Sequence, residues 1–424
     1  MEAFSTRDGV LRAEDVPLPE IAAAVGTPTY VYSAAHLRGQ YQRLRHALGK
    51  LDADICYAVK ANANLAVLRL FAEQGSGFDI VSGGELQRVI SAGGDPAKVI
   101  FSGVGKSVAE IDFALKLGIR CFNVESASEL DCLSERARVL QRQAPVSFRV
   151  NPDVDAGTHP YISTGLRSNK FGIPPGQAVE LYRRAHADEF LSVRGIDCHI
   201  GSQIATTGPL IDALSNLLQL TDRLAADGIR LEHVDVGGGL GIRYGDEEDF
   251  DVTAYGRALG ELLEGRDLKL LLEPGRYLVG NGGVLLTRTR FLKPRTGETE
   301  KNFAVVDAAM NDLIRPALYQ AWHDIRPVTP RTDAAEHCWD VVGPVCETGD
   351  FLAEQRDLAL AEGDLLAIMS AGAYAMVQSS NYNTRPRPAE VLVDGNRFRV
   401  VRRRETTRDQ LALELEAESG ETWR

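Results

Sequence analysis

The sequence has few cysteines, no excess of basic residues and no long apolar run. Its 6 cysteines form no CxxC pair and no zinc-like spacing with histidine, and a chain of 424 residues does not need disulfides to fold. Lys and Arg number 47 against 59 Asp and Glu, so the net charge is −12. This acidity argues against nucleic acid or a membrane surface as the main partner. The longest apolar stretch, 367–377, is too short and too interrupted to span a bilayer.

Nucleotide and targeting motifs are also missing. The stretch Gly105-Lys106-Ser107 is not a P-loop, because position 100 is Ile, and the glycine turn at 237–241 is not GxGxxG, because its last glycine would fall on Ile242. The first eight residues lack the basic and apolar regions of a signal peptide. We therefore expect a soluble, cytoplasmic protein with free thiols and no metal site, and the glycine turn fits a single phosphate better than a nucleotide.

Short apolar runs alternate with helical patterns through the long central region. The predicted strands are 54–60, 77–81, 99–103, 121–125, 146–150, 193–200, 233–239 and 269–273, and the helical patterns include 64–74, 84–91, 108–117, 128–141, 209–226 and 255–263. The strands are mostly apolar, as expected for parallel strands covered on both faces. About eight such units predict an α/β fold, a closed (β/α)8 TIM-type barrel over residues 35–280.

After about residue 281, strand-like runs follow one another without regular helices. They lie at 284–292, 302–308, 339–345, 364–369 and 389–400, and the last contains Asp394-Gly395, a strong hairpin signal. We predict a C-terminal β-sandwich- or β-barrel-like domain from residues 281–424 together with 1–34, whose run 29–32 adds a strand. The end of the chain from Glu405 is charged and helical. The fifth connection of the barrel, including 158–172, is long, and such loops are often functional.

Reactive residues stand where the predicted barrel strands end, and active sites of α/β barrels lie at that end. The set comprises Lys60, Ser82, Glu125, His199, glycines 237–239, Glu273 and Arg276. A solitary lysine at a strand end is usually solvated. Within this ring we interpret Lys60 as a Schiff-base lysine, made nucleophilic by desolvation or nearby charge.

Three other members of the ring each leave two interpretations open. The glycine triplet either turns backbone N–H groups toward an anion or is a tight turn without a ligand. Glu273 either pairs with Arg276 or keeps a cofactor ring nitrogen protonated, as pyridoxal phosphate chemistry requires. His199 is either a core histidine or, given the Gly201-Ser202 that follows, part of a ligand-facing turn.

At these residues the sequence resembles the alanine-racemase-like, fold type III pyridoxal phosphate enzymes, and within them the diaminopimelate decarboxylases. The likeness covers nearly the whole chain. It rests on the order and spacing of Tyr57-Ala58-Val59-Lys60-Ala61-Asn62, His199-Ile200-Gly201-Ser202-Gln203, Gly237-Gly238-Gly239, Glu273-Pro274-Gly275-Arg276, Gly343-Pro344-Val345-Cys346-Glu347 and Gly372-Ala373-Tyr374. It implies a barrel followed by a β-sandwich-like domain that completes the active site, and a head-to-tail homodimer with sites shared between subunits.

The resemblance also implies roles for individual residues. Lys60 corresponds to the lysine that binds the aldehyde of pyridoxal 5′-phosphate, His199 to the histidine stacked on the ring and Glu273 to the carboxylate at the ring nitrogen. Cys346 corresponds to the residue that supplies a proton after CO2 leaves, from the neighbouring subunit. The phosphate ligands would be Ser202, Gly238, the backbone of Gly275 and Arg276, and Tyr374.

The run Met310-Asn311-Asp312-Leu313-Ile314-Arg315-Pro316-Ala317-Leu318-Tyr319 favours a substrate with a second carboxylate. An arginine fork suits a carboxylate, so Arg276 and Arg315 would clamp it. Tyr319 and Tyr374 would add hydroxyl contacts, and Glu347 would meet the distal ammonium. An alternative interpretation of Arg315 is a surface salt bridge.

We therefore expect decarboxylation of meso-2,6-diaminopimelate to L-lysine and CO2, the last step of lysine biosynthesis. The alternatives are a decarboxylase of ornithine, arginine or carboxynorspermidine, a racemase, and a non-catalytic pyridoxal phosphate carrier. Ornithine enzymes resemble the chain, but they typically carry Asp where Glu347 stands and lack the Arg-Pro-Ala-Leu-Tyr run. Carriers resemble the barrel alone.

Overall fold

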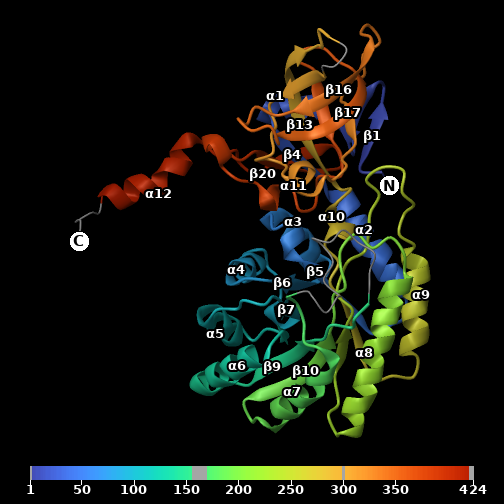
Figure 1. Ribbon diagram of the computed structural model, residues 1–424, viewed down its shortest axis with the longest axis vertical. Coiled ribbons are helices and arrows are strands. Elements are labelled where there is room, and N and C mark those ends of the chain that lie inside the picture. Colours follow the sequence, from blue (N-terminus) through green and yellow to red (C-terminus); the bar gives the residue numbers. More distant parts are fainter. Residues whose placement is uncertain (1, 155–169, 298–300, 420–424) are drawn as a thin grey trace. The chain divides into compact units, whose positions relative to one another are not determined.

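The computed structural model describes residues 2–154, 170–297 and 301–419 (Figure 1). The chain divides into two compact units. The barrel unit comprises Arg38–Ile242 and Glu248–Leu278, and the β unit comprises Met1–Leu37, Arg243–Glu247 and Val279–Arg424. The sequence did not indicate that Arg243–Glu247 would group with the β unit. Most of the long fifth connection, 155–169, lies outside the described residues.

Parallel strands close into a barrel in the barrel unit, as predicted. Around the barrel the order is β10-β11-β12-β5-β6-β7-β8-β9, and each neighbouring pair is parallel. The strands are β5 (Ala53–Ala58), β6 (Gly77–Ile80), β7 (Val99–Phe101), β8 (Cys121–Val124), β9 (Ala144–Arg149), β10 (Leu191–Asp197), β11 (His233–Asp235) and β12 (Lys269–Leu272). Several strands end earlier than predicted, because the backbone turns toward the next helix before the apolar run is over.

Helices lie on the outside of the barrel: the first precedes strand β5, and the others connect successive strands (Figure 1). They are α2 (Ala34–Ala47), α3 (Leu65–Glu73), α4 (Gly83–Ser91), α5 (Val108–Leu117), α6 (Ala127–Leu140), α7 (Pro175–Ala187), α8 (Gly208–Ala226) and α9 (Val252–Leu263). Serines start three of them: the hydroxyls of Ser82, Ser107 and Ser126 each accept a hydrogen bond from a backbone N–H of the first turn. Such caps satisfy N–H groups that the helix itself leaves unpaired. Helix α7 was not predicted.

The β unit is built on a mostly antiparallel sheet, in agreement with the predicted second domain. Its main path is β17-β16-β14-β13-β4-β19-β20, and β18 pairs with β13 and β15. The N-terminal strand β4 (Thr29–Ser33) pairs with β13 (Gly283–Lys293) and β19 (Ala389–Asp394), so the predicted extra strand is confirmed. The other strands are β14 (Asn302–Val306), β15 (Ile325–Pro327), β16 (Glu336–Val342), β17 (Phe351–Ala359), β18 (Leu365–Ile368) and β20 (Arg397–Arg402).

In the remaining parts of the β unit, N-terminal and C-terminal segments of the chain pack around one apolar core. A small sheet of β1 (Phe4–Arg7), β2 (Val10–Ala13) and β3 (Val16–Pro17) is followed by α1 (Leu18–Val25). Buried side chains of both ends of the chain form that core, among them Leu18, Ile21, Val284 and Val391. The predicted run 389–400 is two strands joined by a hairpin, and the turn is made by Gly395 and Asn396, because Asp394 still pairs with Arg397. The charged C-terminal segment forms the helix α12 (Thr407–Ser419).

Two further expectations can be compared with the structure. No helix within the described ranges is long and apolar enough to cross a membrane. All six cysteines are free, as expected from their spacing.

Candidate active site

The carboxyl ends of the barrel strands carry the first set of predicted site residues. Because the strands are parallel and the barrel is closed, residues that follow the strands share one mouth. Lys60 lies there in a 3-10 turn, η1 (Val59–Ala61), directly after β5 instead of at the strand end. His199 follows β10, glycines 237–239 follow β11 and Glu273 follows β12.

The amine of Lys60 is paired with a carboxylate that the sequence analysis did not single out. Its Nζ lies 2.7 Å from Oδ2 of Asp79, whose side chain is completely buried in β6, whereas the Lys60 side chain is 34% exposed. The lysine therefore has both solvent access and a fixed anionic partner. A signal for Asp79 was present in the sequence, since the residue interrupts the apolar strand Gly77–Ile80.

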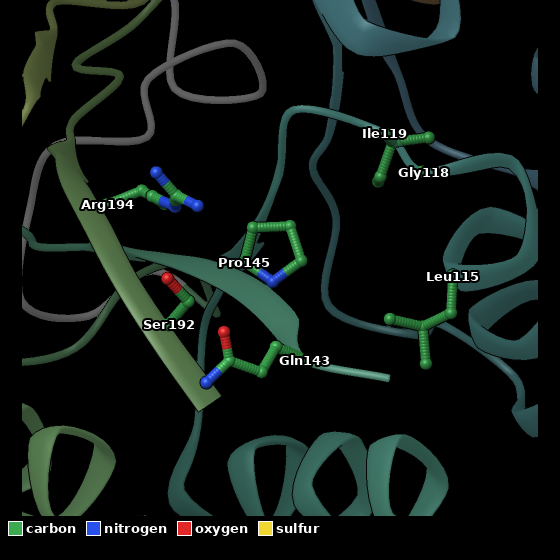
Figure 2. A pocket seen from close by; sticks show the side chains of 7 residues that line it. All are labelled: Leu115, Gly118, Ile119, Gln143, Pro145, Ser192 and Arg194. Atoms are coloured by element: carbon green, nitrogen blue, oxygen red, sulfur yellow. The ribbon is translucent and has the colours of Figure 1, made fainter. Parts of the chain in front are cut away.

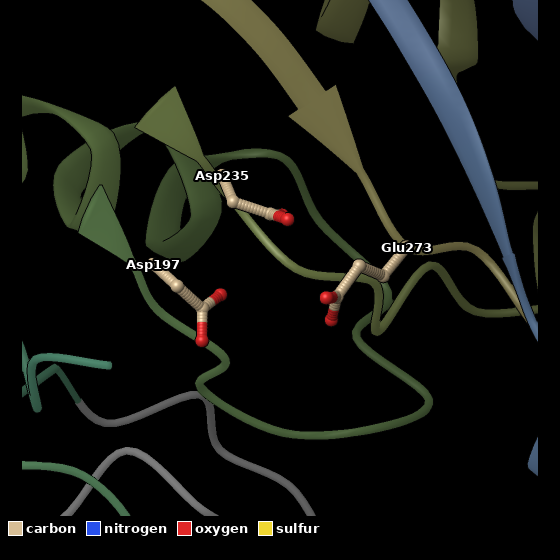
Figure 3. A group of neighbouring side chains, drawn as sticks. All are labelled: Asp197, Asp235 and Glu273. Atoms are coloured by element: carbon tan, nitrogen blue, oxygen red, sulfur yellow. The ribbon is translucent and has the colours of Figure 1, made fainter. Parts of the chain in front are cut away.

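Three more carboxyl groups converge inside the same barrel. One oxygen each of Asp197, Asp235 and Glu273 lies within 4.8 Å of the other two, and all three residues are buried (Figure 3). Burial raises the pKa of Asp235 to about 7 and, with the charge of neighbouring acids, raises the pKa of Asp197 and of Glu273 well above their usual values. The barrel mouth thus holds a cluster of buried carboxyl groups, and a cationic ligand atom would balance their negative charge.

The carboxyl of Glu273 is placed by polar side chains from two other strands. Its Oε1 lies 3.5 Å from the Ser102 hydroxyl and 3.5 Å from Nδ2 of Asn123, which itself donates to Ser102 over 3.2 Å. The backbone N–H of Glu273 donates to the carbonyl of Gly237 over 2.7 Å. A buried carboxyl group held in this way can pair with the protonated nitrogen of a pyridine ring. The positive charge of that nitrogen would offset the negative charge of the carboxyl cluster.

The glycine turn leaves no space for side chains. A Cβ on Gly238 would lie 2.2 Å from the carbonyl oxygen of Glu273, and Gly237 and Gly239 have φ values of +66° and +90°. Nearby, Nη2 of Arg276 donates to the Ser202 hydroxyl over 2.9 Å, and Arg276 is buried. A turn with backbone N–H groups beside a hydroxyl is a donor set that fits a phosphate group, and the guanidinium next to them holds that hydroxyl in place.

His199 is fixed as a neutral ring. The N–H of Gly238 donates to its Nδ1 over 3.2 Å, so that nitrogen carries no hydrogen. Loss of hydration, followed by the positive charges of Arg149 and Lys60, lowers the pKa of His199 well below its usual value. An uncharged flat ring beside the glycine turn suits packing against an aromatic cofactor.

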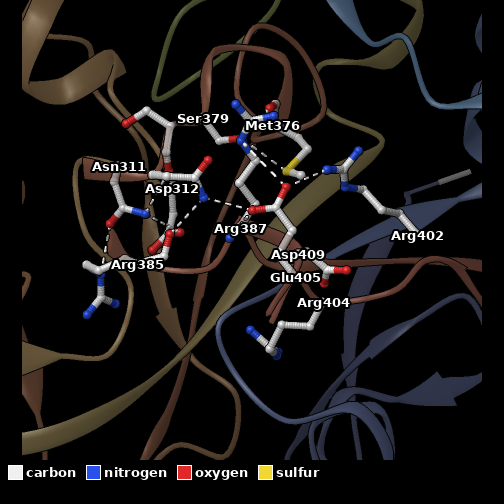
Figure 4. A network of polar contacts seen from close by, with 12 residues as sticks. Asn311, Asp312, Met376, Ser379, Arg385, Arg387, Arg402, Arg404, Glu405 and Asp409 are labelled. Atoms are coloured by element: carbon white, nitrogen blue, oxygen red, sulfur yellow. Dashed lines mark hydrogen bonds and ion pairs between the residues drawn. The ribbon is translucent and has the colours of Figure 1, made fainter. Parts of the chain in front are cut away.

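The second set of predicted residues belongs to the β unit. Arg315 is buried at the start of α11 (Arg315–Tyr319), so the alternative of a surface salt bridge is not supported. The segment before it is anchored by polar contacts: Asn311 accepts from Nε of Arg385 over 3.0 Å, and its Nδ2 donates to Asp312 over 3.0 Å (Figure 4). Later in the helix, Tyr319 accepts a bond of 3.4 Å from Gln378.

Cys346, Glu347 and Tyr374 lie in loops of the β unit. Cys346 is an exposed free thiol, and its backbone N–H donates to the side chain of Asn383 over 2.9 Å. The thiol of Cys346 is therefore not part of the apolar core of the β unit. Glu347 is exposed, and its hydrogen bond raises the pKa of Tyr382. Tyr374 is partly buried with a φ of +54°.

A cavity of 170 Å³ in the barrel unit lies away from these residues. It is lined by Leu115, Gly118, Ile119, Gln143, Pro145, Ser192 and Arg194 (Figure 2). Pro145 and Ser192 stand at the beginnings of β9 and β10, whereas the candidate site stands at the strand ends. This cavity therefore belongs to the opposite end of the barrel.

Known proteins share both the barrel and the β unit. Residues 34–280 match the family described as "Pyridoxal-dependent decarboxylase, pyridoxal binding domain". A diaminopimelate decarboxylase of Pseudomonas aeruginosa is 60% identical over 415 residues, which cover 98% of this chain and 99% of that protein. The chain therefore belongs to the diaminopimelate decarboxylases, a family of carboxy-lyases, and the predicted family and enzyme class are confirmed.

Solved structures agree with this assignment. A diaminopimelate decarboxylase of Helicobacter pylori in complex with L-lysine has 41% sequence identity and a TM-score of 0.91, and the match covers 94% of this chain and 100% of that one. A diaminopimelate decarboxylase of M. jannaschii, also in complex with L-lysine, has 36% identity and a TM-score of 0.92 over 97% of this chain and 98% of that one. The predicted fold class is thereby confirmed.

Proposed function

We propose that the chain decarboxylates meso-2,6-diaminopimelate to L-lysine and CO2 with pyridoxal 5′-phosphate as its cofactor. The observation that carries the proposal is the presence of Lys60, Glu273 and the glycine turn at one mouth of a closed parallel barrel. An amine, a buried acid and an anion-binding turn are the three groups that this cofactor requires. Family membership supports the choice of substrate.

Each residue of the barrel mouth has a defined task in this proposal. Lys60 holds the cofactor by its aldehyde, and Glu273 keeps the ring nitrogen protonated. His199 packs on the ring. The phosphate is held by Ser202, Gly238 and the backbone of Gly275 and Arg276, together with Tyr374 of the β unit. When bound, the cofactor withdraws electrons from the substrate Cα so that CO2 can leave.

The residues of the β unit account for substrate choice and for the proton. Each CO2 released requires one proton at the carbon it leaves, and we assign that proton to the thiol of Cys346. Arg315 and Arg276 bind the carboxylate that is retained in the product, with Tyr319 and Tyr374 beside it, and Glu347 binds the distal ammonium. Ornithine has no such carboxylate, so a buried arginine would oppose its binding.

The proposal includes a cytoplasmic homodimer. Its sites would be shared, with Cys346 supplied by the neighbouring subunit. The exposed position of Cys346 supports this arrangement, because an exposed thiol is accessible to a second chain.

One incubation tests the activity. Purified holoenzyme is given meso-diaminopimelate, and CO2 and L-lysine are measured together, with ornithine, arginine and carboxynorspermidine as competing substrates. Equal amounts of CO2 and L-lysine, with preference for diaminopimelate, are expected. Preference for another amino acid, or racemisation without release of CO2, would contradict the proposal.

A further inference from the structure

The guanidinium of Arg315 is held by a buried histidine of the same unit. Nε of Arg315 donates a hydrogen bond of 3.3 Å to Nε2 of His323. Both side chains are buried, and His323 is 0% exposed. Arg315 begins α11, whereas His323 lies in the loop before β15, so the contact ties the helix to the edge of the sheet.

The hydrogen-bond partners of His323 select one form of its ring. Nδ1 lies 2.8 Å from the backbone carbonyl of Met369, which follows β18. A carbonyl oxygen only accepts, so Nδ1 carries the hydrogen and donates it. Nε2 then presents a lone pair, and this lone pair receives the Nε–H of Arg315. One neutral tautomer satisfies both contacts.

An aromatic ring bounds the same guanidinium. The Cζ of Arg315 lies 5.3 Å from the ring centroid of Tyr244, a distance at which a cation is attracted to the ring. Tyr244 also meets His323 edge-on, with ring centroids 5.3 Å apart. Arg315 is therefore held by the imidazole and by the phenol ring. An arginine fixed in advance loses less rotational freedom when it binds a ligand.

We propose that His323 is a positioning residue for substrate recognition. By accepting the Nε–H of Arg315, it assigns the Nη1 and Nη2 end of the guanidinium to a carboxylate of the amino-acid substrate. That end can bind both oxygens of a carboxylate at once. The inference rests on the proposed function, because it takes Arg315 as a ligand of the carboxylate retained in the product.

Two ligands that differ only in this carboxylate test the proposal. Binding of L-lysine and of 1,5-diaminopentane to the holoenzyme is measured by calorimetry for wild type, His323→Asn and His323→Gln. The Asn amide can still donate to the carbonyl of Met369 but is too short to reach Arg315. The Gln amide is long enough to offer an oxygen to Nε of Arg315. The two variants thus separate the contact with Arg315 from the general effect of replacing the ring.

We expect His323→Asn to reduce the preference for L-lysine over 1,5-diaminopentane about 10-fold or more, since a hydrogen bond to a charged group is lost. His323→Gln should keep that preference within about threefold of wild type. The Asn variant should raise the KM for diaminopimelate and leave kcat nearly unchanged, because the reacting carbon is not touched. Equal preference in the two variants would overturn the proposal.

A double-variant cycle keeps the test decisive if His323→Asn folds poorly. His323→Leu removes the acceptor of the imidazole and should reduce the preference about 10-fold in the wild-type background. Arg315→Lys removes Nε, so His323→Leu in that background should change the preference no further, and an equal loss in both backgrounds would contradict a positioning role. Binding to the wild-type protein distinguishes failure of the proposed function from failure of the role assigned to His323. A wild type without preference for L-lysine counts against the proposed function, whereas a preference that all His323 variants retain counts against His323 alone.

Discussion

Lys60, in the turn after β5, forms an ion pair of 2.7 Å with Asp79 of the neighbouring strand β6, with the carboxylate fully buried and the amine partly open to solvent. Asp79 is the part of the pair that cannot move, because it is enclosed within β6. The ion pair therefore fixes the position of the Lys60 amine. A cofactor bound by that amine would be located by the barrel itself and not by a loop.

Replacement of Lys60 tests the attachment of the cofactor. Lys60→Ala should abolish the absorption band of the bound cofactor, because no amine remains at the mouth to hold the aldehyde. Lys98→Ala is the matched control, since Lys98 donates to the carbonyl of Gly75 outside the site and its loss should leave the band intact. A band of wild-type strength in Lys60→Ala would contradict the assignment.

Glycine 238 should be intolerant of any side chain. Gly238→Ala places a Cβ 2.2 Å from the carbonyl of Glu273, so the turn must shift. We expect cofactor affinity to fall by about 10-fold or more and the free energy of unfolding to fall by about 2 kcal/mol. Gly260→Ala, in α9 with no atom within 4 Å of the added carbon, should be more stable than wild type by about 0.5–1 kcal/mol. Similar cofactor affinity in Gly238→Ala and Gly260→Ala would contradict the conclusion that the turn has no space for a side chain at Gly238.

The sequence was sufficient to predict the barrel and to place a set of candidate residues at its mouth. Apolar runs separated by helical patterns indicate a parallel barrel, and residues after such strands share one mouth, which is why Lys60 and Glu273 could be expected at the same end. Which residue of one strand meets which residue of the next depends on register, so the partner of Lys60 was not foreseen. His323 was missed for the same reason, since its contact with Arg315 depends on the fold.

Two missed elements have local explanations. Strand β17 contains four successive polar residues, 354–357, and its pairing with β16 is irregular, so the alternation that indicates a strand is weak. Helix α7 begins with Pro175, which is a normal first residue of a helix, but the long connection before it concealed that signal.

The cluster of buried carboxyl groups in the barrel should make the free energy of unfolding depend on pH. The pKa of Asp235 is about 7 in the folded protein instead of 3.8, so between these values the unfolded chain ionises while the folded one keeps its proton. Stability from this group is complete at low pH and is lost as the pH rises through 7. Asp235→Asn cannot ionise, so its melting temperature relative to wild type should be higher at about pH 8 than at about pH 4.5.

The cofactor-free protein is the sample for this measurement, because a bound cation would change the charge balance. Asp222→Asn is the control that should not change between these two pH values: the hydrogen bond with Arg266 lowers the pKa of Asp222 below 3.8, so stability from that group is lost only at a pH below the range compared. A melting-temperature difference for Asp235→Asn that does not grow between the two pH values would argue against a protonated buried acid.

Cys346 should act in catalysis and not in cofactor binding. Cys346→Ala should reduce product formation far more than cofactor loading, and Cys338→Ala, which removes another exposed free thiol of the β unit, should change neither. A mixture of inactive Lys60→Ala and Cys346→Ala subunits should recover about a quarter of wild-type activity, since random exchange leaves one complete site in half of the dimers. A mixture that stays inactive would count against a shared site.

Chemical mapping of the cofactor tests the central claim most directly. Borohydride reduction makes the bond between an amine and a bound aldehyde permanent, and digestion followed by mass spectrometry then identifies the modified lysine. We predict a phosphopyridoxyl group on Lys60. A phosphopyridoxyl group on any other lysine, or a protein that carries none after reduction with the cofactor present, would contradict the function proposed for this barrel.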